Sequence, residues 1–154
     1  MNNYLKIFLI SMVPLIELRG AVLYSQYLEM PVVQSYIVCA LGNIIPMPFV
    51  YFFARKILKW GENKRGIGGV CKFLYEKGEK AGRKLTEKAG RRGTFIALLL
   101  FVGIPLPGTG AWTGTLGASI LDMGIKHTFA AVTLGVLLAG AIMMTAGFLG
   151  FNML

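Results

Sequence analysis

The nine residues PLIELRGAV, from Pro14 to Val22, interrupt the first apolar segment of the chain with an acid and a base. A charge in the middle of a membrane-length segment is costly, so such residues face protein or a water-filled cavity. Pro14 ahead of the charges and Gly20 after them favour a break in the helix. We therefore expect a broken segment in which Glu17 and Arg19 have partners elsewhere in the chain.

The composition is that of an integral membrane protein. The 154 residues are 55% apolar, include 20 glycines and have a mean hydropathy of +0.63. A soluble chain this apolar would need a larger core than 154 residues enclose, and glycine is more frequent in membrane helices than in soluble ones. We expect a multi-pass protein of the inner cell membrane with a single domain over residues 1–154.

Positive charge is concentrated in one part of the chain. The net charge is +9, and 13 of the 16 lysines and arginines lie between Arg55 and Arg92. The positive-inside rule places this block in the cytoplasm and explains it without a nucleic-acid partner. We expect a basic cytoplasmic connector over 59–93. It is either an amphipathic helix lying on the anionic inner leaflet or a solvated charged linker with helical tendency.

Four apolar segments reach the length of about 20 residues that a membrane span needs: 5–28, 32–54, 94–121 and 127–152. The second should be kinked by Pro46 and Pro48. The first and third are broken, the third at the sequence PLPGTG between Pro105 and Gly110.

Two halves of the chain show weak internal similarity. With an offset of 90 residues, ELRGAV of the first break aligns with PGTGAW of the second. With an offset of 93, LEM at 28–30 aligns with LDM at 121–123. We therefore expect two repeats, about 5–58 and 94–154, each a broken segment followed by a transmembrane helix.

The broken segments either cross the membrane or turn back within it. Crossing gives parallel halves with both termini inside, whereas turning back gives inverted halves with both termini outside. Lys126 and His127 favour the second scheme, because it places them on the cytoplasmic side. The expected fold is an all-α integral membrane protein. Its inverted repeats each contain a re-entrant hairpin and a transmembrane helix, as transporters with broken helices do.

The two breaks supply the candidate transport, substrate or proton site. Glu17 is a candidate proton or substrate site and Arg19 a candidate anion site. Two residues apart, they would lie on nearly opposite faces of a regular helix, so they need other partners, such as free backbone groups, Asn43 or Thr109. The second break frees N–H groups that can hold an anion, and Trp112 follows it directly. The full candidate set is Glu17, Arg19, Gly20, Asn43, Pro105, Pro107, Gly108, Thr109, Gly110 and Trp112.

A structural interpretation of these residues stays open. The charged pair could lock the break, and the small residues of the second break could allow close helix packing. No catalytic constellation is present, and His127 has no evident ligand partners. We therefore expect no enzyme, no catalytic residue, no metal site and no cofactor.

The motifs E-L-R-G-A and P-x-P-G-T-G-A-W-x-G, in this order and with a basic loop between them, resemble the small multidrug export family. The resemblance covers nearly the whole chain. More distantly, the two breaks look like those of DedA-like (VTT-domain) membrane proteins. These resemblances imply inverted halves with two facing re-entrant loops and movement of lipids or lipid phosphates coupled to ions. This chain is shorter than DedA-like proteins, and its second break carries no acid or arginine.

The function we expect is that of a small secondary transporter, proton-coupled, which exports a small amphipathic molecule by alternating access around two facing tips. One alternative is a lipid or lipid-phosphate flippase or scramblase. An alternative of another class is a structural or adaptor membrane protein. Two halves of this size make a thin wall around a cavity, so we also expect a homodimer. Glycine-rich faces, such as those of Gly135, Gly140 and Gly147, are the candidates for its contact.

Overall fold

The computed structural model describes residues 2–14, 16–64, 66, 68–106 and 109–152, and these residues form helices and connecting turns without a strand. The helices are α1 (Asn3–Met12), α2 (Glu17–Tyr27), α3 (Val32–Ile44), α4 (Met47–Glu62), α5 (Gly68–Gly103), α6 (Ala111–Ile120) and α7 (Ile125–Asn152). The expected all-α class is confirmed.

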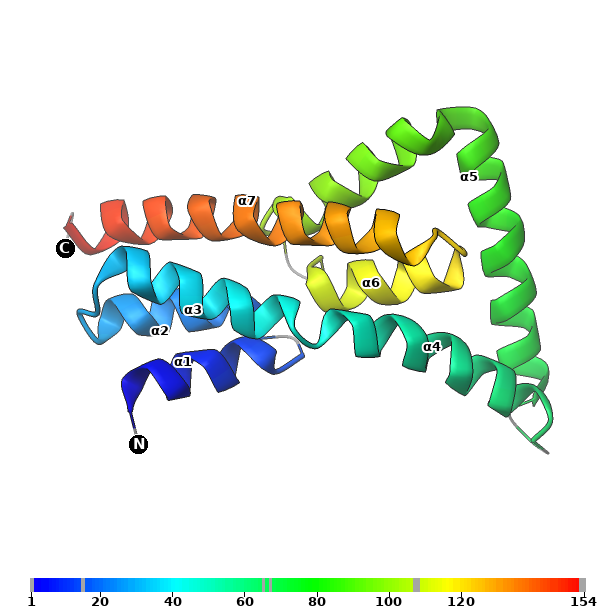
Figure 1. The fold of residues 1–154 in the computed structure, drawn as a ribbon, viewed down its shortest axis with the longest axis horizontal. Coiled ribbons are helices and arrows are strands. Elements are labelled where there is room, and N and C mark those ends of the chain that lie inside the picture. The colour runs from blue at the N-terminus through cyan, green and yellow to red at the C-terminus, as the bar shows by residue number, and fades with distance from the viewer. Residues whose placement is uncertain (1, 15, 65, 67, 107–108, 153–154) are drawn as a thin grey trace.

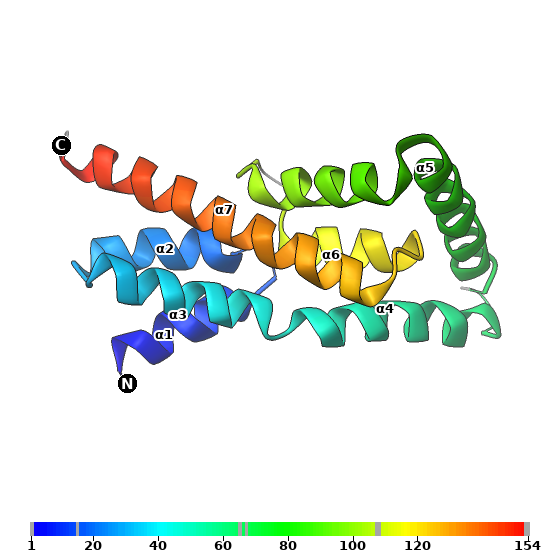
Figure 2. The same cartoon turned by 45° about the horizontal axis from the view of Figure 1, so that its top comes forward.

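The helices lie lengthwise in an elongated bundle (Figures 1 and 2). From the N-terminus α1 leads to the middle of the bundle, and α2 doubles back to the same end. The next two helices, α3 and α4, together run to the opposite end. There the last part of α5 leads back to the middle and α6 doubles back, before α7 returns to the end that holds both termini (Figure 1). Both chain breaks therefore lie near the middle of the bundle.

Three of the helices beside the breaks are only half as long as a membrane span. The lengths of α1, α2 and α6 are 10, 11 and 10 residues. At 1.5 Å per residue each is roughly 15 Å long, about half of a 30 Å hydrocarbon core. The predicted breaks are confirmed, because neither α1 and α2 nor α5 and α6 join into one continuous helix.

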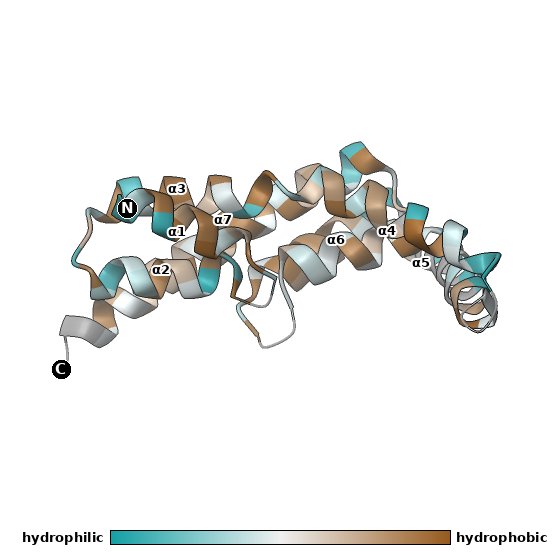
Figure 3. Ribbon diagram, turned by 90° about the horizontal axis from the view of Figure 1, so that it is seen from below, coloured by the Kyte–Doolittle hydropathy of each residue, from teal (hydrophilic) through white to brown (hydrophobic). Residues whose placement is uncertain are grey.

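Among the described residues, two stretches are long and apolar enough to cross a membrane by length and composition, Val32–Glu62 and Ile125–Gly150. Less than half of the most apolar part of each is buried inside the chain, unlike the core helix of a soluble protein. Large apolar side chains are also exposed on the other helices, Leu5 and Leu9 on α1 among them. Figure 3 shows hydrophobic residues along α1, α3 and α4, whereas hydrophilic residues are frequent along α5. This outer surface fits lipid better than water.

Proline and glycine bend the two longest stretches. The predicted proline kink is confirmed, because α3 ends at Ile44 and α4 begins at Met47. Gly90, inside α5, has φ 65° and ψ 176°, a region that is essentially restricted to glycine. The basic block is therefore mostly helical, in the end of α4 and in α5. Both alternatives for this block, an amphipathic helix on the inner leaflet and a solvated charged linker with helical tendency, stay open.

The two halves share helix boundaries 93 residues apart. Tyr27 ends α2 and Ile120 ends α6, while Val32 begins α3 and Ile125 begins α7. The predicted alignment at this offset therefore has matching secondary structure on both sides of the turn.

The turns between these helices have the same backbone geometry. Glu29 and Asp122 have φ values of 50° and 56°, both left-handed. In each turn the next amide donates to the carbonyl five residues earlier, at 3.1 Å in the first half and 2.9 Å in the second. This is the hydrogen bond of a Schellman helix end. By contrast, the predicted offset of 90 at the breaks is wrong in register. Gly20 lies inside α2, whereas Gly110 precedes α6.

Glycines of α7 allow close packing against the chain's own helices. A Cβ built at Gly135 would lie 2.7 Å from Val102 Cβ of α5, and Cβ atoms at Gly140 and Gly147 would overlap side chains of α3 and α2. The prediction that these three glycines form a dimer contact is wrong, because they are buried within one chain. A homodimer, if formed, uses another face.

Candidate functional site

The first break supplies a carboxylate to the N-terminus of the helix that follows the second break. Glu17 is 6% exposed, and its two carboxylate oxygens accept the backbone N–H groups of Ala111 at 3.3 Å and Trp112 at 3.0 Å. These N–H groups open α6, where the helix dipole is positive. Gly110 makes this approach possible, because a Cβ there would lie 2.7 Å from Glu17 Cδ.

Arg19 holds the other side of the second break. Its guanidinium donates to the carbonyl of Leu106, to those of Ile104 at 3.3 Å and Val102 at 3.4 Å, and to Thr109 Oγ1 at 3.0 Å. These carbonyls lie at and just after the C-terminal end of α5, where the helix dipole is negative. Thr109 supports the same turn, since its hydroxyl donates to the carbonyls of Ile104 and Leu106.

The two charges of the first break therefore compensate the two helix ends of the second. The expectation that Glu17 and Arg19 need partners is confirmed for free backbone groups and for Thr109. Glu17 also has a φ of 53°, which is uncommon for a residue with a side chain. Such strain persists where the surrounding structure holds it, and it is concentrated at functional sites.

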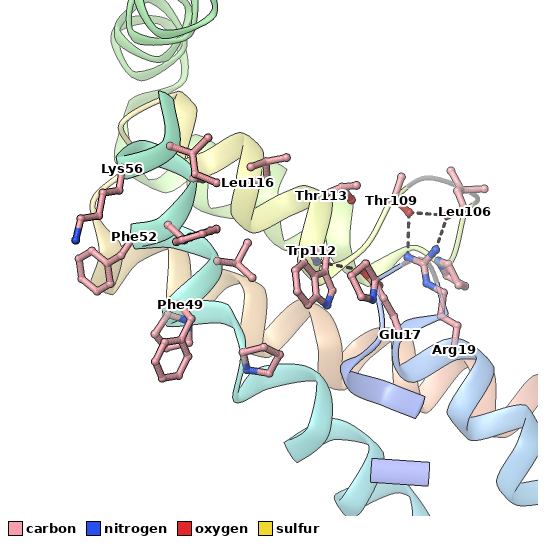
Figure 4. A pocket seen from close by; sticks show the side chains of 18 of the residues that line it. Glu17, Arg19, Phe49, Phe52, Lys56, Leu106, Thr109, Trp112, Thr113 and Leu116 are labelled. Carbon is pink, nitrogen blue, oxygen red and sulfur yellow. Dashed lines mark hydrogen bonds between the residues drawn. The ribbon is translucent and has the colours of Figure 1, made fainter. Parts of the chain in front are cut away.

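A cavity of about 1180 Å³ extends from this point along α4 (Figure 4). Glu17, Arg19 and Thr109 lie at one end, together with Pro105 and Trp112. Most of the remaining lining is apolar. The cavity exceeds the roughly 300–1,000 Å³ of a typical small-molecule site. Its lining combines a long apolar wall with a few polar groups gathered at one end.

Aromatic side chains of α4 form the outer part of the cavity. Phe49, Phe52 and Phe53 all line it, and they are 74%, 61% and 63% exposed. Lys56 follows on the same side of the helix and also lines the cavity. The sequence analysis did not identify this face. Its four residues are nevertheless spaced as i, i+3, i+4 and i+7, which places them on one face of a helix. The exposed phenylalanines leave the cavity open along α4.

The structure brings together six of the ten candidate residues. Glu17, Arg19, Pro105, Thr109 and Trp112 line the cavity, and Gly110 contacts Glu17. Pro107 and Gly108 lie outside the described residues.

The other two candidates do not reach the cavity. Gly20 is within α2, and Asn43 is a buried residue of α3 that is not part of the cavity wall. Asn43 Oδ1 is buried without a hydrogen-bond partner among the described atoms, and the predicted pairing of Asn43 with Glu17 or Arg19 is wrong. Within the described ranges, no three His, Cys, Asp or Glu side chains gather as metal ligands.

A family model described as "Putative small multi-drug export protein" matches residues 17–142. The chain belongs to this family. The match begins at Glu17, just after the first break, and includes the second break, all of α2 to α6 and most of α7. All the residues that line the cavity except Pro14 and Met143 lie within the matched range. No curated protein and no solved structure matches the chain.

Family and structure agree on the general class of the molecule. The family description is that of an exporter rather than of an enzyme, and the two long apolar stretches are those of a membrane protein. In this member of the family, the candidate site is the reciprocal contact between the two breaks and the cavity beside it.

Proposed function

We propose that this chain is a proton-coupled secondary transporter that exports an amphipathic molecule across the inner membrane by alternating access. The observation that carries the proposal is the position of Glu17. It is a buried, strained carboxylate that forms one end of a large apolar cavity in a member of an export family.

The proposed membrane placement makes the two breaks the tips of re-entrant hairpins. Helices of roughly 15 Å reach only the middle of a 30 Å core, and the two pairs of half-length segments enter from opposite ends of the bundle (Figure 1). The long stretches 32–62 and 125–150 would then cross the membrane in opposite directions. The halves would be inverted, with both termini outside and the basic block inside, as the positive-inside rule requires.

Protonation of Glu17 is the proposed coupling step. As a carboxylate it accepts two N–H groups of α6, and these charge-assisted bonds hold the two breaks together. A proton on the carboxylate removes its charge and turns one acceptor oxygen into a donor. The start of α6 is then free to separate from the first break. Substrate in the cavity and a proton on Glu17 would thus act on the same contact.

Transport by the purified protein in liposomes tests this proposal. The probes are ethidium, as a fluorescent amphipathic cation, and pyranine, as a reporter of internal pH. Glu17→Gln should abolish proton-linked ethidium movement. Glu29→Gln is the matched control, because Glu29 is also an acid at positive φ but is exposed in a turn. Equal transport by both variants, with both folded, would contradict the role of Glu17.

A lipid flippase or scramblase is the second candidate function. The observation that favours it is the opening of the cavity along Phe49, Phe52 and Phe53, through which lipid tails could remain in the bilayer while a head group enters. Dithionite quenching of a fluorescent phospholipid in the same liposomes separates the two functions. Rapid loss of the inner-leaflet signal, without ethidium movement, would favour the lipid function.

The structural or adaptor alternative also has an observation in its favour. Glu17 and Arg19 satisfy backbone groups that a break leaves unpaired, and this role needs no substrate. A protein of this kind would move neither ethidium nor lipid, and its Glu17→Gln variant would differ in stability alone.

A further inference from the structure

The cavity beside the two breaks extends from the middle of the bundle along one half of it. Its deep end lies where the breaks and the α3–α4 kink meet, because Pro14, Pro46 and Pro105 all line it. From there it follows α4 as far as Lys56 and Ile57. Lys56 is ten residues beyond Pro46. At 1.5 Å per residue it lies about 15 Å from the kink, half of a hydrocarbon core of roughly 30 Å. The cavity therefore spans the depth of one leaflet.

The residues that follow Lys56 on α4 are typical of a membrane–water interface. Lys59 and Trp60 occupy the next turn, and Trp60 is 61% exposed. The ammonium of Lys64 lies over the Trp60 ring, 4.7 Å from its centroid. Tryptophan and lysine anchor the ends of membrane spans at the level of the head groups. With the basic block in the cytoplasm, as proposed above, the outer end of the cavity lies at the head groups of the inner leaflet.

The wall between these two ends is open to the acyl chains of the same leaflet. Phe49, Phe52 and Phe53 line the cavity and are more than half exposed. Leu116 of α6 also lines it and is 43% exposed. In a bilayer these side chains contact lipid rather than water. A molecule dissolved in the leaflet could therefore enter sideways, past the phenylalanines of α4.

The polar groups at the deep end are already hydrogen-bonded to the protein itself. Both carboxylate oxygens of Glu17 accept backbone N–H groups. The Arg19 guanidinium donates to three carbonyls and to Thr109, whose hydroxyl donates to carbonyls of the same turn. A head group brought here would lose its hydration and find few free partners, a cost that an apolar chain does not have. The deep end therefore suits the apolar end of an amphiphile.

The charged side chains of the lining favour an anion at the outer end. Among the described lining residues, Glu17 is the only acid, and Arg19 and Lys56 are the two cations. Lys56 is exposed, and its side chain extends beside Phe52 at the end of the cavity away from the breaks (Figure 4). A basic residue at this level attracts anionic head groups. A cationic head group would meet no acid of the described lining there.

We infer that the cavity takes up, chain first, an anionic amphiphile with one apolar chain from the inner leaflet. The head group would stay at Lys56, and the chain would lie along Phe49, Phe52 and Phe53 toward Trp112. These phenylalanines lie on one face of one helix, which offers a track for a single chain one leaflet long. This assignment names a substrate class for the exporter proposed above and rests on that function and its membrane placement. It reverses the orientation of the flippase alternative, in which the head group enters.

Fluorescence of Trp112 tests what occupies the cavity. The chain has two tryptophans, so Trp60→Phe leaves one, in the cavity wall. This variant is placed in phosphatidylcholine liposomes, and dibromostearate is added at alkaline pH as an anionic amphiphile whose bromines quench tryptophan on contact. We expect quenching that saturates. Hexadecyl sulfonate should reverse it at a concentration about fivefold lower than hexadecyltrimethylammonium, which has the same chain and a cationic head. Equal displacement by both would overturn the anionic assignment.

A matched pair of lysine variants tests the position of the head group. Lys56→Gln should weaken the apparent affinity for dibromostearate about fivefold, because it removes the cation at the outer end. Lys59→Gln removes the same charge from an exposed residue of the same helix that does not line the cavity. It should change the affinity by about twofold at most. Equal losses in the two variants would show diffuse attraction and overturn the head-group position.

A matched pair of threonine variants tests the position of the chain. Thr113→Phe narrows the cavity beside Trp112 and should weaken binding about tenfold. Thr145→Phe is the control, because Thr145 is also exposed and its hydroxyl also donates to a carbonyl one turn earlier, but it does not line the cavity. Equal affinities in these two variants would overturn the chain position. If any variant fails to fold, the comparison of the sulfonate with the ammonium compound still decides the charge of the ligand.

The sideways opening has a test of its own. Phosphatidylcholine with brominated acyl chains should quench Trp112, whereas acrylamide dissolved in the water should quench it weakly. The opposite result would show a water-filled cavity and overturn uptake from the leaflet.

Failure of the transport proposal can be told apart from failure of this assignment, because binding needs no proton gradient. Saturable quenching in a protein that moves neither ethidium nor the amphiphile would keep the binding site and remove transport. Proton-linked ethidium movement without quenching of Trp112 would keep transport and overturn the amphiphile. If both proposals hold, hexadecyl sulfonate should inhibit ethidium movement at a lower concentration than the ammonium compound.

Discussion

Because Gly110 contacts Glu17, we predict that Gly110→Ala and Glu17→Ala have non-additive effects on the free energy of unfolding. A Cβ at position 110 would lie 2.7 Å from both Cδ and Oε1 of Glu17, and closer still to Oε2. Carbon atoms pack at roughly 3.5–4.0 Å, so the carboxylate would have to retreat by about 1 Å. Its bonds to Ala111 and Trp112, now 3.3 and 3.0 Å, would then exceed hydrogen-bond range.

The size of the effect follows from those two bonds. A hydrogen bond to a charged group contributes about 1.5–3 kcal/mol, and the cavity can return some solvent to the freed groups. Gly110→Ala should therefore lower the free energy of unfolding by about 3 kcal/mol. Gly110 has φ 161°, extended backbone that alanine also adopts, so backbone strain adds nothing. Glu17→Ala should cost a similar amount, because it removes the same acceptor.

The double variant, Glu17→Ala with Gly110→Ala, tests whether the two substitutions disrupt the same contact or act independently. Once Glu17 is alanine, a methyl group at position 110 meets no carboxylate, and only the small cost of alanine at a helix N-cap remains, about 0.5–1 kcal/mol. The double variant should lose about 3–4 kcal/mol rather than about 6 kcal/mol. Reversible unfolding in mixed micelles measures each value. Gly117→Ala in the same helix is the control, since its Cβ would meet nothing within 4 Å. A double variant that loses the full sum would refute the reasoning.

The remaining predictions concern the Arg19 cap, the kink in α5, the packing of α7 against α5 and the topology. Arg19→Lys should lower the free energy of unfolding by about 2 kcal/mol, because lysine cannot reach the same carbonyls with a planar fork; unchanged unfolding would argue against this cap. Gly90→Ala should cost about 1–3 kcal/mol through its positive φ alone, since its Cβ meets no atom, and an unchanged melting temperature would contradict the kink. Gly135→Ala should cost about 1–3 kcal/mol by overpacking against α5, and should leave any oligomer intact. With both native cysteines replaced, a cysteine at position 2 should label from outside intact cells and one at 125 should not; the reverse pattern would require crossing segments.

The helix breaks and the turns could be predicted from the sequence because they depend on local chemistry. Proline removes a backbone donor wherever it stands, so the ends of α1, α3 and α5 follow from the sequence. The turn at Glu29 and its counterpart at Asp122 were also visible, because both follow a leucine and precede a methionine at the same spacing. Local rules of this kind need no knowledge of what lies across the bundle.

The lining of the cavity and the packing of the glycines could not be predicted in the same way. A glycine stripe looks the same whether it faces a second copy or the chain's own α5, and Gly135 proved to be inside. The first break, between α1 and α2, has fewer residues than the second, between α5 and α6. The alignment of Gly20 with Gly110 therefore paired a residue inside α2 with one that precedes α6. His127 looked isolated because Phe95, whose ring it packs against, is more than 30 residues away in sequence.

The reciprocal caps link the structural and the transport interpretations of the two charges. A broken helix in lipid leaves N–H and C=O groups unpaired, each at a cost of several kcal/mol. Glu17 and Arg19 satisfy them from the opposite half of the chain, so the halves cannot separate at the middle without exposing these groups. In a protein with only a structural role, caps from within the same half would satisfy the unpaired N–H and C=O groups equally well. Caps that cross between the halves, and that include an acid, would suit the proposed function, in which this contact forms and breaks in step with a proton.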